Sequence, residues 1–435
     1  MKHTVEEVKL KNGARGLLID VPDATVMSFQ VQFRAGDRYV RDKEIYETAH
    51  LMEHMAFGAN EKFRSEHAYE QEFIKNGAYH NAYTSDYSMV YEAVCADFEW
   101  DRILELQRLA IVTPRFTSDS FEAEKGNVRS ELTGYLNNHS RVLWLRVQQA
   151  LGEDILTDSQ RLKKMDNVTI KDIKEHHRRT HTLNNMRFVI AGKMAGRKTA
   201  IKDFLEQWQL EPGERFAIPR DELHGARPLL IRRKEASNLN FGWSISLPRE
   251  LTNEESDAMG CLNHILTGTL SSRILGMARK KGLVYGMFSD TSVGFYDSSW
   301  DFGGQVNLET AEVLFDIIVR ELKKVLNGNI AAEDIEAAKS YALGRYQMGA
   351  QTVAQISNFY TRRYFSDDFV KDYAGVPAAI LAITAEKIIQ VAGEFLDSDV
   401  RVLAGVSSGD RDLLLRLQEK LCQRSEERRV GKECR

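Results

Sequence analysis

Strict alternation of apolar and polar side chains makes residues 26–34 the clearest predicted strand of the chain. A two-residue period is typical of a strand with one buried face. Residues 5–21 hold two further apolar segments around Asn12-Gly13, a dipeptide that favours a hairpin turn. Residues 76–94 have the pattern of a turn followed by strands, and the continuous apolar segment 185–192 is typical of a buried strand.

Apolar side chains that recur every three or four positions predict helices between and after these strands. One helix is expected over 97–113, where Thr113-Pro114 ends the pattern. Ser118 or Asp119 can cap the helix that follows. The other expected helices are 141–151, 170–181, 309–326, 331–349 and 410–421.

The pattern of the first half of the chain returns in the second half. Leu247 ends a second alternating segment 214 positions after Phe33 ends the first, and 400–406 echoes 187–192 at nearly the same offset. The repeat indicates two copies of one α/β unit. We therefore expect an α+β protein of two homologous α/β halves, each with a mixed, mostly antiparallel sheet and helices on one face.

Composition sets the expected boundaries of these halves. Residues 211–228 hold three prolines and two glycines, which predicts a linker between an N-terminal half, 1–210, and a C-terminal half, 229–422. The last segment, 423–435, is charged and lacks hydrophobic periodicity. We expect it to be a disordered extension or a sequence-assembly artefact.

The overall composition is that of an ordinary globular protein. The 435 residues are 43% hydrophobic and 28% charged, with a net charge of −4, which gives no reason to expect a nucleic acid or an anionic membrane as partner. The N-terminus lacks the apolar core of a signal peptide, and no apolar stretch approaches the ~20 residues of a membrane span. The four cysteines are scattered without a CxxC pair, so a reduced, cytoplasmic protein is expected.

The segment His50-Leu51-Met52-Glu53-His54 carries the strongest chemical signal. Positions i and i+4 of a helix lie on one face, so His50 and His54 can bind one metal ion together. Glu53 points toward the same place and could take a proton from a metal-bound water. A second pair at this spacing, His177 and His181, has no carboxylate between its members and is flanked by arginines, so we do not expect it to bind metal.

A catalytic zinc takes three protein ligands and keeps one position open, so a third ligand must come from elsewhere in the chain. Glu124 and Glu131 are the best candidates, because their spacing of about two helical turns directs both side chains to one side. His50-x-x-Glu53-His54 followed by these two glutamates, with Glu131 placed 77 positions after His54, resembles the pitrilysin (M16) metallopeptidases. That family includes insulin-degrading enzyme and the mitochondrial processing peptidase.

The resemblance implies roles for these side chains. Glu131 would be the third ligand of one Zn²⁺ per chain, Glu124 a supporting carboxylate and Glu53 the general base. The segment from Gly77 to Thr84 also resembles the family's Gly-x-x-x-Asn-Ala-x-Thr segment, a sheet edge against which the substrate chain lies. Backbone-directed substrate binding is thus implied for Asn81, Ala82 and Tyr83. The alternative is an aromatic-rich structural hairpin, in which His80 is an ordinary strand residue.

The second half keeps one histidine of the metal motif, because His264 lies 214 positions after His50 while the glutamate and second histidine are replaced. We expect metal in the first half alone, in a cleft between the halves. Lys281-Gly282-Leu283-Val284-Tyr285 resembles a family segment whose tyrosine reaches the transition-state oxyanion. The family's arginine is replaced by Ala278. Arg279 could substitute for it, or a partner subunit could supply the group.

Together these features predict a zinc-dependent endopeptidase that hydrolyses extended peptides or unfolded segments, with Tyr285 and Arg279 as catalytic aids. The length resembles that of two-domain family members, which implies a homodimer or a heterodimer with a related subunit. The alternative function is a non-catalytic or partner-dependent structural subunit. The intact metal motif of the first half favours the enzyme.

Overall fold

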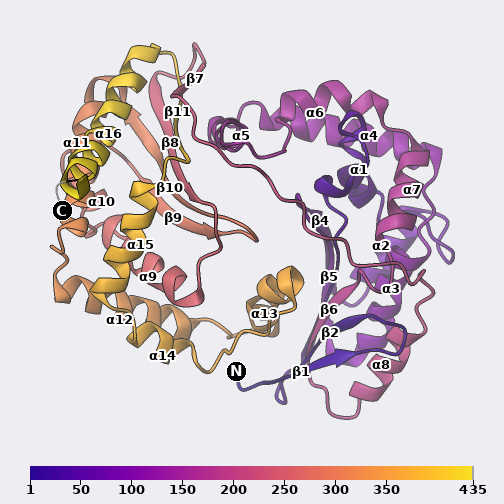
Figure 1. Ribbon diagram of the computed structural model, residues 1–435. Coiled ribbons are helices and arrows are strands. Elements are labelled where there is room, and N and C mark those ends of the chain that lie inside the picture. Colours follow the sequence, from indigo (N-terminus) through magenta and orange to yellow (C-terminus); the bar gives the residue numbers. More distant parts are fainter. Residues whose placement is uncertain (434–435) are drawn as a thin grey trace. The chain divides into compact units, whose positions relative to one another are not determined.

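The computed structural model describes residues 1–433, which form two compact units that are each built around one sheet (Figure 1). Unit 1 contains 1–134, 158–219 and 347–373. Unit 2 contains 135–157, 220–346 and the chain from Ala374 onward. The change of unit at Pro219 and Arg220 falls inside the predicted linker.

Unit 1 has a six-stranded sheet in the order β1-β2-β6-β3-β5-β4. The β2 and β6 strands are parallel and the other neighbours are antiparallel, which confirms the predicted mixed, mostly antiparallel sheet. The predicted hairpin turn is formed at Gly13, whose φ of +100° suits glycine. The strands are β1 (Thr4–Lys9), β2 (Arg15–Asp20), β3 (Val26–Phe33), β4 (Tyr79–Thr84), β5 (Met89–Ala96) and β6 (Arg187–Gly192).

Unit 2 repeats this sheet in the order β7-β11-β8-β10-β9. Its β7 and β11 are parallel and the rest antiparallel, so each strand has an equivalent in the series β2-β6-β3-β5-β4. This correspondence confirms the two-copy organisation predicted from the 214-residue repeat. The strands are β7 (Leu229–Arg232), β8 (Asn238–Leu247), β9 (Met287–Val293), β10 (Ser298–Asn307) and β11 (Arg401–Ser407).

Each unit also contains helices, several of which are amphipathic and pack on its sheet. Those of unit 1 are α1 (Thr48–His54), α2 (Glu66–Ile74), α3 (Trp100–Val112), α4 (Ser118–Tyr135), α6 (Asp158–Lys164), α7 (Ile170–Thr180), α8 (Lys198–Glu206) and α13 (Val353–Asp367). Those of unit 2 are α5 (His139–Leu151), α9 (Asn253–Asn263), α10 (Leu275–Lys280), α11 (Ala311–Leu326), α12 (Ala332–Met348), α14 (Val376–Leu381), α15 (Ala385–Asp397) and α16 (Arg411–Glu433). A π-helical turn, His264–Gly268, follows α9.

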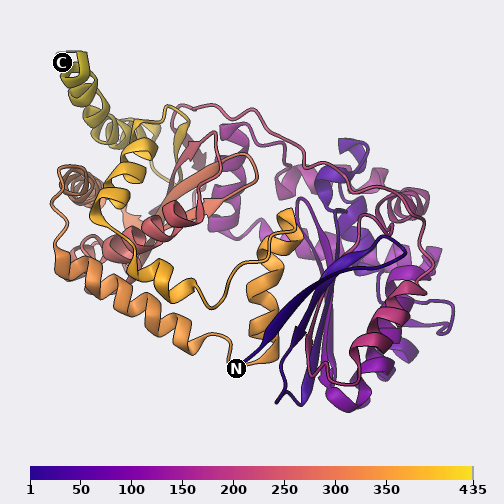
Figure 2. The same ribbon diagram turned by 60° about the horizontal axis from the view of Figure 1, so that its bottom comes forward.

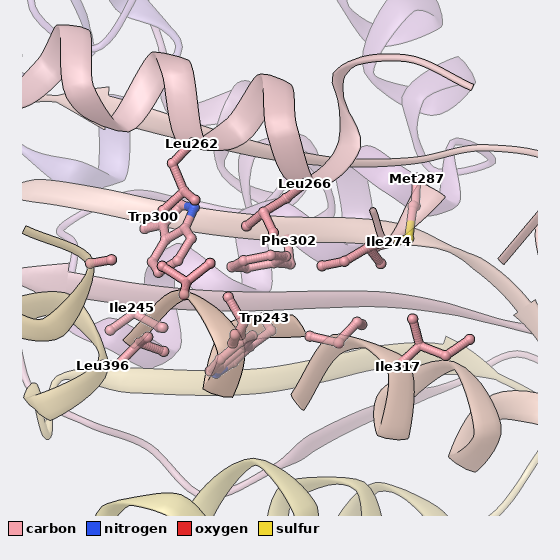
Figure 3. Packing of buried hydrophobic residues seen from close by; sticks show 14 of the residues in the cluster. Trp243, Ile245, Leu262, Leu266, Ile274, Met287, Trp300, Phe302, Ile317 and Leu396 are labelled. Atoms are coloured by element: carbon pink, nitrogen blue, oxygen red, sulfur yellow. The ribbon is translucent and has the colours of Figure 1, made fainter. Parts of the chain in front are cut away.

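The core of unit 2 lies between its sheet and the helices on one face (Figure 3). Phe302 stacks on Trp243 there and lies tilted against Trp300. The indole Nε1 of Trp300 donates to Asn263 Oδ1 at 2.8 Å. At the end of the chain, α16 continues to Glu433 through most of the segment that we expected to be disordered. Residues 434 and 435 lie outside the described part.

Each sheet is also covered on its second face by a helix from the other half of the sequence (Figures 1 and 2). In unit 1, α13 packs on β6 and β3, where Val353 and Ile356 meet Val189 and Ala191. The Arg187 guanidinium also donates to Asp368 at the end of α13. The expectation of helices on one face is therefore incomplete.

In unit 2, α5 covers β11 and β8 in the same way. Val147 packs with Val402 and Ala404. Gly242 of β8 lies so close that a Cβ there would be 3.3 Å from the Trp144 ring. The starts of α5 and α13 are 214 positions apart, so equivalent helices are exchanged between the two halves. The physical reason is that strands buried on both faces need cover on both sides.

Two further findings concern the whole described chain. Cys95 and Cys261 are buried free thiols, and Cys434 lies outside the described residues. Among residues 1–433, no helix is long and apolar enough to cross a membrane.

Histidines of α7 and its end are part of the unit 1 core. His181 stacks on Phe33 and on His177 with 4.3 Å between ring centroids, and its Nε2 lies 2.8 Å from the Tyr91 hydroxyl. His176 Nε2 donates to the Ala35 carbonyl at 2.8 Å. Burial lowers the pKa of His176 to about 4, although that hydrogen bond opposes the shift. These contacts agree with the prediction that His177 and His181 are not a metal pair.

The exchange of α5 and α13 predicts that the halves cannot be separated by cutting the linker. If a protease site is inserted after Pro219 and cleaved, the two fragments should co-elute in size-exclusion chromatography. Five large α13 side chains buried in unit 1 alone are worth on the order of 10 kcal/mol; they are Val353, Ile356, Tyr360, Tyr364 and Phe365. Fragments that elute as separate folded monomers would contradict this.

The buried His176 predicts acid sensitivity. In the unfolded chain His176 has its ordinary pKa of 6.5 and is protonated below that pH. In the folded chain it stays neutral until about pH 4. The free energy of unfolding should therefore fall as the pH drops from 6.5 to 4, by up to about 1.4 kcal/mol per pH unit for this group. Urea unfolding with chelator at pH 7.5, 6 and 5 measures the slope. His176→Gln should make the slope shallower, and an equal slope would refute the assignment.

Candidate metal centre

Helix α1 presents the histidine motif because its other side is buried. Ala49, Leu51 and Met52 have no exposed surface and fix the helix in the core of unit 1. The side chains of His50 and His54 lie on the opposite side and are 13% and 23% exposed. Their ring centroids are 4.8 Å apart. The helical spacing thus places both imidazoles together, as expected from the sequence.

Glu131 completes a set of three donor atoms. Its Oε2 lies 3.3 Å from His54 Nε2 and 3.6 Å from His50 Nε2. Glu131 is on α4, which is held in place by the buried Val128 and Leu132. The structure therefore brings together the three residues that the resemblance named as zinc ligands.

Glu53 borders the same centre. Its Oε2 lies 4.0 Å from His50 Nε2. Among the described residues, His50, Glu53 and His54 form a group whose potential ligand atoms all lie within 4.8 Å of one another. Burial raises the pKa of Glu53, the two histidines oppose this shift, and Glu131 adds to it. Glu53 and Glu131 are thus both candidates for the third ligand position, and Glu131 lies closer to the Nε2 atoms.

The second nitrogen of each imidazole is held by another carboxylate. His54 Nδ1 lies 3.0 Å from Glu124 Oε2, and His50 Nδ1 lies 3.1 Å from Glu47 Oε2. A carboxylate accepts a hydrogen, so both Nδ1 atoms carry the proton in this assignment and both Nε2 atoms have a free lone pair. Carboxylate–histidine contacts of this kind are typical around bound zinc. The donor set of two imidazoles and one carboxylate fits a zinc site that keeps a position open.

Glu47 and Arg161 were missed by the sequence analysis. Burial disfavours the Glu47 anion, but the His50 hydrogen bond and the Arg161 charge lower the pKa of Glu47 to about 2. Arg161 comes from α6, far along the chain, so no local pattern reveals it. A carboxylate three residues before His50, on the same helical face, was the available signal for Glu47.

The predicted substrate-binding residues lie on β4, the edge strand of the unit 1 sheet. Asn81 and Tyr83 are exposed, whereas Ala82 is buried. Helix α1 contacts this strand, which places the edge beside the histidine motif. His80 belongs to the same strand, and its Nε2 lies 2.6 Å from Glu70 Oε2.

Tyr285 and Arg279 are neighbours in unit 2. The Tyr285 side chain is 91% exposed, and the Arg279 guanidinium lies 5.0 Å from the centre of its ring while donating to the Tyr285 carbonyl. Ala278 has no exposed surface, so a side chain at that position points into the unit 2 core. Arg279 is therefore the arginine that reaches the tyrosine. The catalytic roles of both residues remain predictions.

A two-unit α+β fold with a histidine–glutamate centre in the first unit defines a metallopeptidase-like class of protein. A model described as the insulinase family, peptidase family M16, matches residues 16–161. A second model, described as the peptidase M16 inactive domain, matches residues 167–341. The chain belongs to peptidase family M16.

Sequence relatives agree with this assignment. An uncharacterized zinc protease of Rickettsia bellii is 24% identical over 424 residues, which cover 92% of this chain and 96% of the relative. The mitochondrial-processing peptidase subunit beta of Bos taurus is 30% identical over 169 residues, 38% of this chain and 34% of that subunit.

Solved structures share the fold. A protease from Helicobacter pylori matches with a TM-score of 0.80 and 18% identity over 93% of this chain and 99% of that one. A structure described as a peptidase M16 inactive domain, from Pseudomonas fluorescens, matches with a TM-score of 0.83 and 17% identity over 94% and 99% of the two chains.

The geometry predicts which carboxylate is the ligand. In zinc titrations of the metal-stripped chain, Glu131→Gln should weaken binding strongly, because a neutral amide is a much weaker zinc ligand than the carboxylate nearest both Nε2 atoms. Glu53→Gln should retain most of the affinity. Competition with a fluorescent chelator measures both variants against the unchanged chain. The reverse order of affinities would show that Glu53, and not Glu131, is the ligand.

Proposed function

We propose that this protein is a zinc-dependent endopeptidase that hydrolyses peptide bonds in extended peptides or unfolded segments. The observation that carries the proposal is the convergence of His50 Nε2, His54 Nε2 and Glu131 Oε2 with the carboxylate of Glu53 beside them. The names of the Rickettsia relative and of the matching family support it.

The residues at this centre have separate roles in the proposed reaction. His50, His54 and Glu131 would hold the zinc ion. A bound zinc supplies a Lewis acid that polarises the scissile carbonyl and lowers the pKa of water. Glu53 accepts the proton of the attacking water and delivers it to the leaving amine. Its partly buried position and raised pKa suit a group that must both take up and release a proton.

The β4 edge supports an extended substrate. An edge strand has backbone N–H and C=O groups available for one more strand, so a peptide can bind through its main chain. A folded protein keeps these groups occupied, which favours unfolded segments as substrates. Asn81 and Tyr83 present exposed side chains on this strand, and the end of β4 is close enough to the centre that Thr84 influences the pKa of Glu53.

Tyr285 is proposed to donate a hydrogen bond to the tetrahedral oxyanion, with Arg279 in place of the arginine expected at Ala278. A second candidate function follows from the alanine at position 278. If Arg279 does not act there, the chain is a partner-dependent subunit whose partner supplies the group. Relatives named as a beta subunit of a processing peptidase fit a dimer, either of this chain or with a related subunit.

The decisive test is cleavage of a quenched, unfolded peptide by the purified chain. Glu53→Gln should lower kcat about a hundred- to ten-thousand-fold, because it removes the general base but keeps the ligands. Chelation should abolish cleavage, and added zinc should restore it. Glu206→Gln, on α8 of the same unit and paired with the exposed Lys11, is the matched control and should cleave normally.

The outcomes separate the two candidate functions. Cleavage by the unchanged chain alone, lost on chelation and in Glu53→Gln, supports the self-sufficient enzyme. A chain that binds zinc but cleaves nothing would exclude it and favour the partner-dependent subunit.

A further inference from the structure

A buried ion pair lies directly behind His50. Glu47, the residue before α1, has a side chain with no exposed surface, and Arg161 of α6 is 11% exposed. The guanidinium donates from Nε and Nη2 to both carboxylate oxygens, with 3.0 Å between Nη2 and Oε2. Arg161 also lies 3.6 Å from Asp158 of its own helix.

Fold stability does not account for this pair. Removing two charges from water costs free energy that their attraction barely returns, and apolar replacements of buried pairs are often neutral or stabilising. Two apolar side chains of similar size could fill the same space in the core. The presence of charges at this place therefore calls for a second role, and the contact with His50 supplies one.

The two members of the pair favour opposite tautomers of His50. Glu47 Oε2, at 3.1 Å from Nδ1, accepts a hydrogen from that nitrogen. Arg161 Nη2, at 3.3 Å, could donate to the same nitrogen if it carried no hydrogen. Because the guanidinium already donates to both Glu47 oxygens, the carboxylate contact is favoured. That tautomer leaves the lone pair on Nε2, the atom that faces Glu131.

We propose that Glu47, anchored by Arg161, is a positioning residue that fixes the metal-ready tautomer and orientation of His50. The proposal deepens the proposed function and rests on its zinc site. Glu124 has the equivalent contact with His54 but shares its carboxylate with the Asn127 amide at 3.2 Å. The two imidazoles are thus held by different means, one by a buried ion pair and one by a more accessible carboxylate.

Zinc affinity of the metal-stripped full chain is the first measurement. Glu47→Gln should weaken zinc binding about ten- to a hundredfold, as is usual when a partner of a ligating histidine is lost. The double variant Glu47→Met, Arg161→Met removes both charges and keeps the side-chain volume. It should bind zinc weakly. Because the variant also removes the cation beside Asp158, circular dichroism checks that the chain is still folded.

A matched control separates loss of an ion pair from loss of the His50 contact. Asp368→Asn breaks the pair with Arg187 in the same unit without touching the metal centre. It should lower the melting temperature and leave zinc affinity unchanged.

The tautomer itself gives a readout that needs no zinc. In ¹⁵N-imidazole NMR of the metal-stripped chain, His50 should carry its hydrogen on Nδ1, and Glu47→Gln should raise the population with the hydrogen on Nε2. An unchanged tautomer in Glu47→Gln, or normal zinc affinity in the double variant, would overturn the proposal. Failure of the unchanged chain to bind zinc would instead overturn the proposed function, whatever the tautomer shows.

Discussion

Burial of both faces of the central strands is the constraint on which the structure depends. Strands β6 and β11 are apolar along nearly their whole length, so neither sheet can leave a face in water. Each half of the sequence supplies helices for one face of its own sheet and one helix, α5 or α13, for the second face of the other. The chain leaves unit 1 just after Glu131 and returns just before Arg161. Glu131 and Arg161, which both belong to the candidate metal centre, therefore lie on either side of the segment that carries α5 into unit 2.

The metal centre shows how a short helix can hold a reactive group. Helix α1 has few residues, and its own hydrogen bonds cannot fix two imidazoles. Buried neighbours such as Leu51 hold the backbone, and carboxylates on the Nδ1 atoms orient the rings. The ring orientations thus depend on Glu124 of α4 and on Glu47, which precedes α1 and is anchored by Arg161 of α6. Two histidines four residues apart are common in helices. Here the contacts with Glu47 and Glu124 leave the Nε2 atoms of both rings as the donor atoms.

Much of this could be predicted from the sequence, where periodicity or fixed spacing carried the information. Alternation in 26–34 predicted β3, the repeat predicted two sheets of one topology, and His50 and His54 met Glu131 as expected. Long-range partners could not be predicted in this way. Nothing local indicates that Arg161 lies on Glu47, or that α13 covers β6, because such contacts depend on the complete fold. Composition predicted a linker at 211–228, and one change of unit falls within that segment, but composition gave no sign of the exchanged helices.

The exchanged helices also show why the second half matters to the first although it lacks the metal motif. A second unit that shared no helix with the first could be removed without exposing the first sheet. Here the half with Thr267 and Gly268 in place of Glu53 and His54 contributes α13 to the sheet of unit 1. Loss of α13 would expose one face of that sheet to water. The packing of unit 1 thus requires the second half of the chain, whatever part that half takes in catalysis.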